Sequence, residues 1–355
     1  MQDTTLTLPT VDLTPFLSCT SANLSPEAMQ ECRSAAESLL KYSILILRDP
    51  RVSESDNDRF LNLMEAYFDQ PLDLKMLDVR PELGYQVGAT PERTELPVCG
   101  RDPECLKRVE ALSPNDKPID FSGPDPKWRF FWRMGDRPEH TKYRELNAPQ
   151  VIPKEFPQWP EEMNAWGSKL FGAINTLAEM LAIGFDIPRD TFARMTNLGP
   201  HLLAPTGSDL ATYSKPGTVL AGFHTDLNFL TIHGKSRYPG LRIWTKQGKR
   251  LRVQIPDGCL LVQAGKQMEW LTGGEIPAGF HEVAVLPETL KAIETQEALG
   301  RPLWRVSSTM FFHIASDQIL EPLGKFKNSD RAARYPPTEA GSQVQTELGL
   351  LKLMA

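Results

Sequence analysis

The spacing of apolar residues divides this chain into a helical first half and a strand-rich second half. In the first half, three stretches have apolar residues at the period of a helix with one buried face. The first stretch follows Ser25, the second follows Ser55, and the longest runs from Trp159 to Gly184. We expect three helices, the first two outside the main sheet and the third as a scaffold behind it. The apolar run 44–47 has the length of a strand.

Short strand-length segments separated by turn residues dominate the second half. These segments are residues 217–223, 229–232, 241–244, 251–255 and 259–263. Such spacing predicts an antiparallel β-sandwich or a jelly-roll barrel. Because no repeat or linker divides the chain, we expect one mainly β domain with flanking helices over residues 1–355. Its expected parts are N-terminal helices, strands and a lid loop in 1–200, the jelly-roll core in 201–320, and a C-terminal helix in 321–355.

Between residues 81 and 127 the chain becomes rich in proline, glycine and charged residues and loses its periodicity. Loops of this length are uncommon in compact domains unless they cover or bind a ligand. We therefore expect part of this stretch to cover a pocket. The aromatic run 128–133 follows. We favour a buried strand there over a pocket wall, because Phe and Trp supply core area more often than they contact ligands.

The composition narrows the range of partners. The 355 residues are 41% hydrophobic and 24% charged, and their formal net charge is −6. These are ordinary values for a globular protein. No basic run is present, so we expect no binding to nucleic acid or to an anionic membrane surface. No apolar run approaches the roughly 20 residues that span a bilayer. The expected partner is a small molecule, and the oligomeric state stays open.

The cysteines favour a reducing compartment. The chain has five, an odd number without metal-type spacing, and its N-terminus lacks a charged-then-apolar leader. We therefore expect a cytoplasmic protein. Cys99 and Cys105 lie in one polar loop and are able to pair, but free thiols are the stronger expectation in such a compartment.

Two residues of metal-binding type lie two positions apart in residues 222–232, where β-branched and aromatic residues predict a strand. Side chains alternate across a strand, so His224 and Asp226 are expected to face the same side. Two histidines and one carboxylate on one face of a metal suit a non-heme Fe(II) oxygenase. The His-x-Asp pair alone is a weak signal, and a surface pair on an edge strand is the plain alternative.

The third ligand has to come from another histidine. His281 follows a turn and opens a strand-like segment, so we take it as that ligand. His233 is the rival, but it lies seven residues beyond Asp226 in one expected strand, which would place it far from the metal. His140 lies in a polar stretch, where a solvated side chain is expected.

A possible carboxylate-binding pair follows in the strand-like residues 304–312. Alternation places Arg305, Ser307, Thr309 and Phe311 on one face if no bulge intervenes. A guanidinium beside a hydroxyl suits the binding of a carboxylate through charge-assisted hydrogen bonds. A surface arginine beside a solvated serine is the alternative.

The order of these residues resembles the Fe(II)/2-oxoglutarate-dependent dioxygenases, in their isopenicillin N synthase-like branch. The resemblance rests on His224-x-Asp226, His281 and Arg305-x-Ser307, and it covers most of the chain. Five further segments match that branch in order: residues 10–13, 230–232, 239–243, 257–262 and 335–338.

The resemblance implies a double-stranded β-helix, a jelly-roll variant, flanked by helices. It implies that His224, Asp226 and His281 ligate Fe(II). It also implies that Arg305 and Ser307 bind 2-oxoglutarate, which is a co-substrate together with O₂. The expected reaction is oxidation of an unactivated C–H bond by hydroxylation, desaturation or oxidative cyclisation, with release of succinate and CO₂.

The resemblance also implies that Phe311 faces the substrate. Leu227 and Phe223 add apolar surface near the expected metal, and Arg133 is a candidate partner for a substrate carboxylate. These residues suggest a small amino acid or a natural-product intermediate. From the branch alone we expect a role in specialised (secondary) metabolism.

Two features depart from that branch. The gap between His281 and Arg305 is long and contains a helix-like piece at residues 288–293. Residues 201–205 read His-Leu-Leu-Ala-Pro where relatives carry Asn-Tyr-Tyr-Pro, so the tyrosine that usually contacts 2-oxoglutarate is missing. Three alternatives stay open: a zinc hydrolase with the same ligands, an iron oxidase independent of 2-oxoglutarate, and a catalytically silent jelly-roll binding protein.

Overall fold

Two β-sheets form the centre of the molecule in the computed structural model, which describes residues 8–20, 23–119 and 121–351. The larger sheet consists of β1 (Thr10–Asp12), β2 (Ile44–Arg48), β3 (Gly88–Thr90), β4 (Trp128–Met134), β5 (His201–Leu203), β6 (Thr206–Asp209), β8 (Leu230–His233), β11 (Cys259–Ala264), β13 (Trp304–Ser307) and β14 (Thr309–Phe312). The smaller sheet consists of β7 (Val219–His224), β9 (Leu241–Trp244), β10 (Arg250–Arg252) and β12 (Phe280–Ala284). A separate pair joins β15 (Ile319–Leu320) to β16 (Thr338–Glu339).

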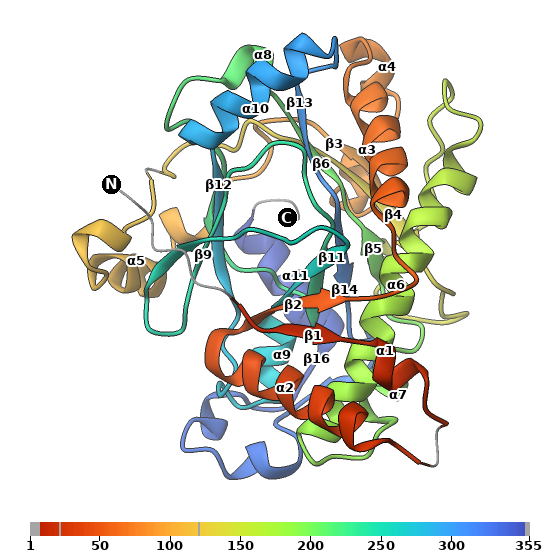
Figure 1. Ribbon diagram of the computed structural model, residues 1–355, viewed down its shortest axis with the longest axis vertical. Coiled ribbons are helices and arrows are strands. Elements are labelled where there is room, and N and C mark those ends of the chain that lie inside the picture. The colour runs from red at the N-terminus through yellow and green to blue at the C-terminus, as the bar shows by residue number, and fades with distance from the viewer. Residues whose placement is uncertain (1–7, 21–22, 120, 352–355) are drawn as a thin grey trace.

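The strand order is that of a jelly roll, the double-stranded β-helix that the sequence predicted. The larger sheet runs β1-β2-β11-β8-β14-β5-β4-β6-β13, with β3 beside β4, and the smaller sheet runs β10-β9-β12-β7. Strands from the first 134 residues therefore share one sheet with strands of the expected core. Figure 1 shows β9 and β12 of the smaller sheet across from β11 and β14 of the larger one.

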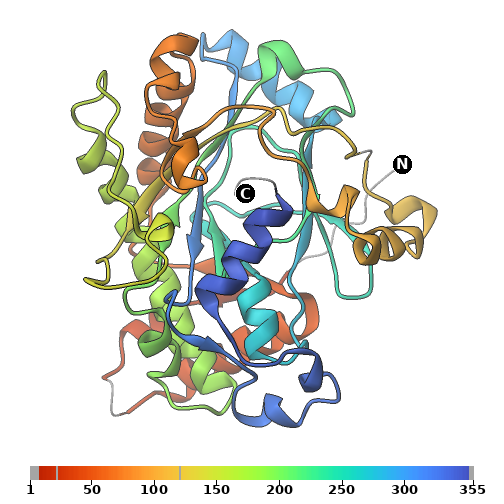
Figure 2. The ribbon, with the colours of Figure 1, turned by 180° about the vertical axis from the view of Figure 1, so that it is seen from behind.

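Helices surround the two sheets. They are α1 (Thr14–Leu17), α2 (Pro26–Tyr42), α3 (Glu54–Phe68), α4 (Leu72–Met76), α5 (Pro103–Glu110), α6 (Trp159–Gly184), α7 (Thr191–Thr196), α8 (Leu210–Tyr213), α9 (Lys266–Leu271), α10 (Pro287–Ala298) and α11 (Ala340–Leu350). The three long helices predicted from apolar spacing are α2, α3 and α6. In Figure 2, α11 crosses in front of the space between the two sheets. No helix among the described residues is long and apolar enough to cross a membrane.

Local chemistry explains where these helices begin. The Ser25 side chain accepts a hydrogen bond from the Ala28 amide at the start of α2. The cap of α3 is Ser53, in a capping box with Asp56, so this helix begins just before the expected Ser55. Both caps satisfy amide groups that have no partner inside the helix. On α6, buried residues such as Trp159 pack against aromatic side chains of α3 and β4.

The prediction of one strand over residues 222–232 is wrong. β7 ends at His224 and pairs with β12 in the smaller sheet, whereas β8 begins at Leu230 and pairs with strands of the larger sheet. The residues between them carry the chain from one sheet to the other. Asp226 therefore lies in a crossover, and strand alternation is not what orients it. The expected strand 251–255 is also shorter, because β10 ends at Arg252.

The expectation of free thiols at Cys99 and Cys105 is also wrong, because these residues form a disulfide. A short turn at Val98–Gly100 and the first turn of α5 bring their Cα atoms to 5.1 Å, within the usual disulfide range. Cys19, Cys32 and Cys259 are free thiols.

Candidate metal centre

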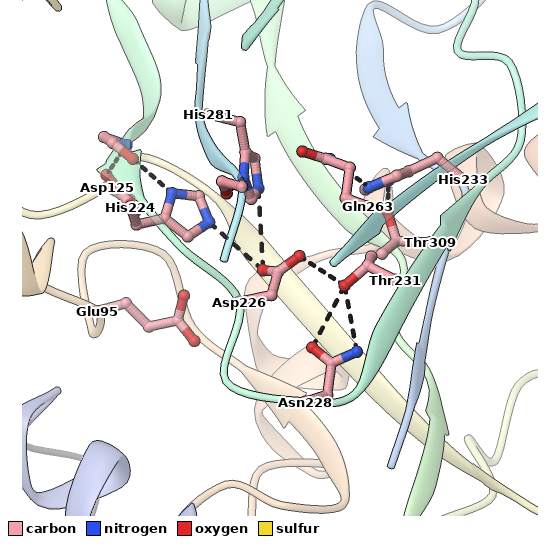
Figure 3. Close-up of polar contacts among 12 residues, drawn as sticks. Glu95, Asp125, His224, Asp226, Asn228, Thr231, His233, Gln263, His281 and Thr309 are labelled. Carbon is pink, nitrogen blue, oxygen red and sulfur yellow. Dashed lines mark hydrogen bonds and ion pairs between the residues drawn. The ribbon is translucent and has the colours of Figure 1, made fainter. Parts of the chain in front are cut away.

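His224, Asp226 and His281 meet in one cluster, and their ligand atoms all lie within 4.8 Å of one another. Asp226 Oδ1 is 3.9 Å from His224 Nε2 and 3.8 Å from His281 Nε2. Figure 3 shows both imidazoles pointing at this carboxylate. Asp226 and His281 are buried, and the His224 side chain is 29% exposed. Two imidazole nitrogens and a carboxylate oxygen form a compact donor set.

Strand pairing brings the two histidines together. His281 on β12 lies directly opposite His224 on β7, and the ring centroids are 4.2 Å apart. Each Nδ1 faces a nearby carbonyl oxygen: that of Gly222 at 2.5 Å from His224 and that of Gly279 at 3.2 Å from His281. Donation from Nδ1–H to a carbonyl leaves the Nε2 lone pair for a metal. These contacts therefore orient both rings as ligands.

Asp226 is held from its other side. Its Oδ2 accepts a hydrogen bond of 2.6 Å from Thr231 Oγ1, and Asn228 joins the same group of contacts (Figure 3). Burial by itself would raise the pKa of Asp226, but His281, His224 and Thr231 bring it below its usual value. Burial, reinforced by His281, lowers the pKa of His224 to about 3. The site thus presents a carboxylate and a neutral imidazole, the forms that bind metals.

A cavity of about 920 Å³ opens beside this cluster. Both sheets, α11 and the segment 81–127 line it. The expectation of one long loop in that segment is wrong, because the segment contains β3 and α5. Arg305, Ser307, Thr309 and Phe311 all face it, so the alternation predicted for 304–312 is confirmed despite the break at Ser308. Leu227 also lines the cavity, as expected.

Arg305 is a buried cation without a counter-charge among the described residues. Its exposure is 5%, and no carboxylate among the described residues pairs with it. Its Nε–H finds no hydrogen-bond partner in the part of the chain that the structure describes. Burial lowers the pKa of Arg305 to about 10. Such a group lacks compensation until a negatively charged ligand arrives.

Two expected pocket residues lie elsewhere. Phe223 stacks on Phe280 at 4.5 Å and packs against Trp244, so its ring belongs to a separate apolar cluster. Arg133 donates to the carbonyl oxygens of Leu146 and Asp136 and to other acceptors, and it does not line the cavity. These hydrogen bonds connect β4, which carries Arg133, to neighbouring loops. We therefore withdraw both residues from the substrate pocket.

His233 is closer to the site than its distance along the sequence suggested, because β8 and β12 belong to facing sheets. Its ring centroid lies 6.4 Å from that of His281, and it lines the cavity. Its two nitrogens contact Gln263 and Thr309, each at 3.0 Å. Both ring nitrogens are thus engaged, and His233 stays outside the metal-type cluster.

One charged group of the cavity, formed by residues of the segment 81–127 and of β4, was not predicted from the sequence. Glu95 contacts both Lys127 and Arg129, and Lys127 also contacts Asp125. All four residues line the cavity. The available signal was the alternation of Arg129 and Phe131 in the aromatic run, which places both on the same face of β4. Nothing in the sequence indicated Glu95, because it lies in irregular backbone.

Comparison with known proteins finds similarity to oxygenases over part of the chain. The model of the 2OG-Fe(II) oxygenase superfamily matches residues 200–314. Kihadalactone A synthase LFS from Citrus sinensis is 24% identical over 199 residues, 53% of this chain and 54% of that protein. The chain therefore spans about half the length of this curated relative.

Solved structures share the fold over nearly the whole chain. A putative 2OG-Fe(II) oxygenase family protein from Caulobacter crescentus has a TM-score of 0.74 at 22% identity, covering 96% of this chain and 98% of that one. Neurospora crassa T7H, solved in complex with alpha-KG, has a TM-score of 0.72 at 17% identity, covering 98% of each chain. At these identities the likeness concerns the fold.

Proposed function

We propose, from the membership of residues 200–314 in the 2OG-Fe(II) oxygenase superfamily, that this protein is an Fe(II)- and 2-oxoglutarate-dependent dioxygenase acting on a small molecule. One observation carries the proposal: the same cavity is lined by a His-Asp-His cluster and by a buried arginine that has no carboxylate partner among the described residues. We further propose that the chain works as a single oxygenase domain, since strands from its N-terminal part complete the larger sheet.

The donor set of the cluster fits Fe(II). Two imidazole nitrogens and one carboxylate oxygen on one side, with other positions open, suit non-heme iron. His224, Asp226 and His281 would hold the metal, and Thr231 keeps the carboxylate in place. When bound, Fe(II) and 2-oxoglutarate supply the activation of O₂ that oxidises a C–H bond, with release of succinate and CO₂.

The surroundings of Arg305 fit a dicarboxylate. The guanidinium would bind the distal carboxylate of 2-oxoglutarate, and Ser307, the next residue on the same face, would donate a second hydrogen bond. A ligand carboxylate would supply the counter-charge that Arg305 lacks. The need of Arg305 for a counter-charge favours the 2-oxoglutarate-dependent reaction over the zinc hydrolase, the co-substrate-independent oxidase and the silent binding protein.

The rest of the cavity would orient the substrate and exclude water. Residues of the segment 81–127 and of the end of α11 line the same cavity as the metal-type cluster and would cover it, and Phe311 and Leu227 provide apolar surface there. Exclusion of water protects reactive intermediates and strengthens the electrostatic contacts inside the site. Hydroxylation, desaturation and oxidative cyclisation are all compatible with this arrangement.

Anaerobic titration of the Fe(II)-loaded protein with 2-oxoglutarate tests the proposal. We expect the weak visible charge-transfer band of a chelated keto acid, and its loss in Arg305→Ala at concentrations that saturate the wild type. Lys235→Ala is the matched control, because Lys235 also lines the cavity but contacts Asp257. Iron binding without a band in the wild type would contradict the use of 2-oxoglutarate.

A further inference from the structure

The cations that line the cavity are paired almost throughout. Each lysine or arginine facing it contacts a carboxylate, with Arg305 as the exception among the described residues. The pairs are Lys127 with Glu95 and Asp125, Arg129 with Glu95, Lys235 with Asp257, Arg252 with Glu288, and Lys266 with Glu269. Arg305 is therefore the one cation that the described residues of the cavity leave for a ligand.

The proposed function uses that cation. With 2-oxoglutarate and Fe(II) bound, their opposite double charges balance, and the single charges of Asp226 and Arg305 balance as well. The neighbouring group of Asp125, Lys127, Glu95 and Arg129 contains two carboxylates and two cations, so it is also neutral. A net negative charge on the substrate would then find no free cation among the described lining residues, which is unfavourable.

Glu95 and Arg129 together present an acceptor beside a donor. The Glu95 carboxylate accepts from Arg129 and from Lys127 and has further lone pairs available. Arg129 uses Nη1 for Glu95 and Nη2 for Thr90 and Tyr85, and its Nε–H has no partner among the described residues. Figure 3 shows the Glu95 carboxylate on the His224 side of the metal cluster.

Flat apolar surface adjoins this polar pair. The Arg129 guanidinium lies 3.8 Å from the Phe131 ring centroid, and Phe131 meets Phe311 edge to face at 6.0 Å. Phe131, Leu202, Ala204 and Phe311 form one apolar cluster, and all four line the cavity. Aromatic walls of this kind favour ring-shaped ligands.

We propose that the primary substrate is a ring compound without an anionic group, which carries an N–H group beside a carbonyl group. The N–H group donates to Glu95, the carbonyl oxygen accepts from Arg129, and the ring lies against Phe131 and Phe311. This inference rests on the proposed function and narrows it. It replaces the small amino acid expected from the sequence, because the carboxylate partner suggested for that substrate, Arg133, is engaged with other groups.

Calorimetric titrations of the protein loaded anaerobically with Fe(II) and 2-oxoglutarate test the inference. The probes are uracil, 1,3-dimethyluracil, L-proline and benzoate. We expect uracil to bind most tightly. Blocking both N–H groups in dimethyluracil is expected to weaken binding at least about tenfold, the effect of losing a hydrogen bond to a charged group. Tighter binding of proline or benzoate, equal binding of the two uracils, or no uracil binding at millimolar concentration would overturn it.

A variant separates this inference from the proposed function. Glu95→Gln replaces a charged acceptor with a neutral one and should weaken uracil binding about fivefold. It should leave the 2-oxoglutarate charge-transfer band unchanged, whereas Lys235→Gln should change neither property. Absence of the band in the wild type would contradict the proposed function. A normal band with unchanged uracil affinity in Glu95→Gln would overturn only the assignment of the substrate.

Discussion

Arg305 and Arg129 line the same cavity and are similarly buried, at 5% and 8% exposure, but their surroundings differ. Arg129 contacts Glu95, which also binds Lys127. Arg305 has no such partner among the described residues. A buried charge without compensation is costly, and a protein retains one where a ligand completes the pair. The charges of Arg129, Glu95 and Lys127 compensate one another without a ligand. This group therefore suits uncharged ligand groups that add hydrogen bonds.

The largest effect is expected from loss of a metal ligand. His281→Ala should abolish Fe(II) binding and turnover, because only Asp226 and His224 then remain of the donor set. His233→Gln is the matched control, since His233 lies nearby but outside the cluster. Metal content after anaerobic loading, with circular dichroism to verify folding, provides the measurement. Full iron retention in His281→Ala would contradict the assigned ligands.

The next effect concerns the unpaired cation. Removing one partner of a buried, hydrogen-bonded charge pair costs about 2–5 kcal/mol, roughly thirtyfold to several thousandfold in affinity. Arg305→Ala should therefore weaken 2-oxoglutarate binding by that factor and leave Fe(II) binding intact. Anaerobic titration followed at the charge-transfer band measures it. An affinity within threefold of the wild type would show that another group binds the distal carboxylate.

The different surroundings of Arg305 and Lys127 predict opposite changes in the stability of the ligand-free protein when each charge is removed. Arg305→Met removes an uncompensated charge and should raise the free energy of unfolding by about 1 kcal/mol or more. Lys127→Met leaves Glu95 and Asp125 less compensated and should lower it by about 3–5 kcal/mol. Urea unfolding of both variants and of the wild type measures these two changes in the free energy of unfolding. A stability change of the same sign in both would remove the distinction between the two regions.

The smallest expected effect is a change in the free energy of unfolding at acidic pH. Burial would raise the pKa of Glu95, but Arg129 and Lys127 outweigh it and bring the folded-state pKa to about 2, below the usual 4.5. Ionised Glu95 therefore contributes stability above pH 4.5, and this contribution is lost as pH falls towards 2. In Glu95→Gln the free energy of unfolding should fall less steeply over that interval. Parallel pH profiles for variant and wild type would contradict this role.

Chemistry confined to short segments could be predicted from the sequence. Alternation correctly placed Arg305, Ser307, Thr309 and Phe311 on one face, because a strand orients its side chains whatever it packs against. Apolar periodicity correctly predicted the long helix α6, and the helix-like residues 288–293 between His281 and Arg305 lie in α10. The residue types of the His-Asp-His set could likewise be identified in the sequence before the fold was known.

Contacts between distant segments were decided only by the tertiary structure. Asp226 reaches the histidines from a crossover between two sheets, a position that period-two spacing cannot encode. Glu95 meets Arg129 across 34 positions of the chain. The local sequence pattern also could not show that Phe223 packs against Trp244 and Phe280 and does not itself line the cavity. Side-chain alternation determines which face a residue occupies, whereas the packing of both sheets and the segment 81–127 determines what that face meets.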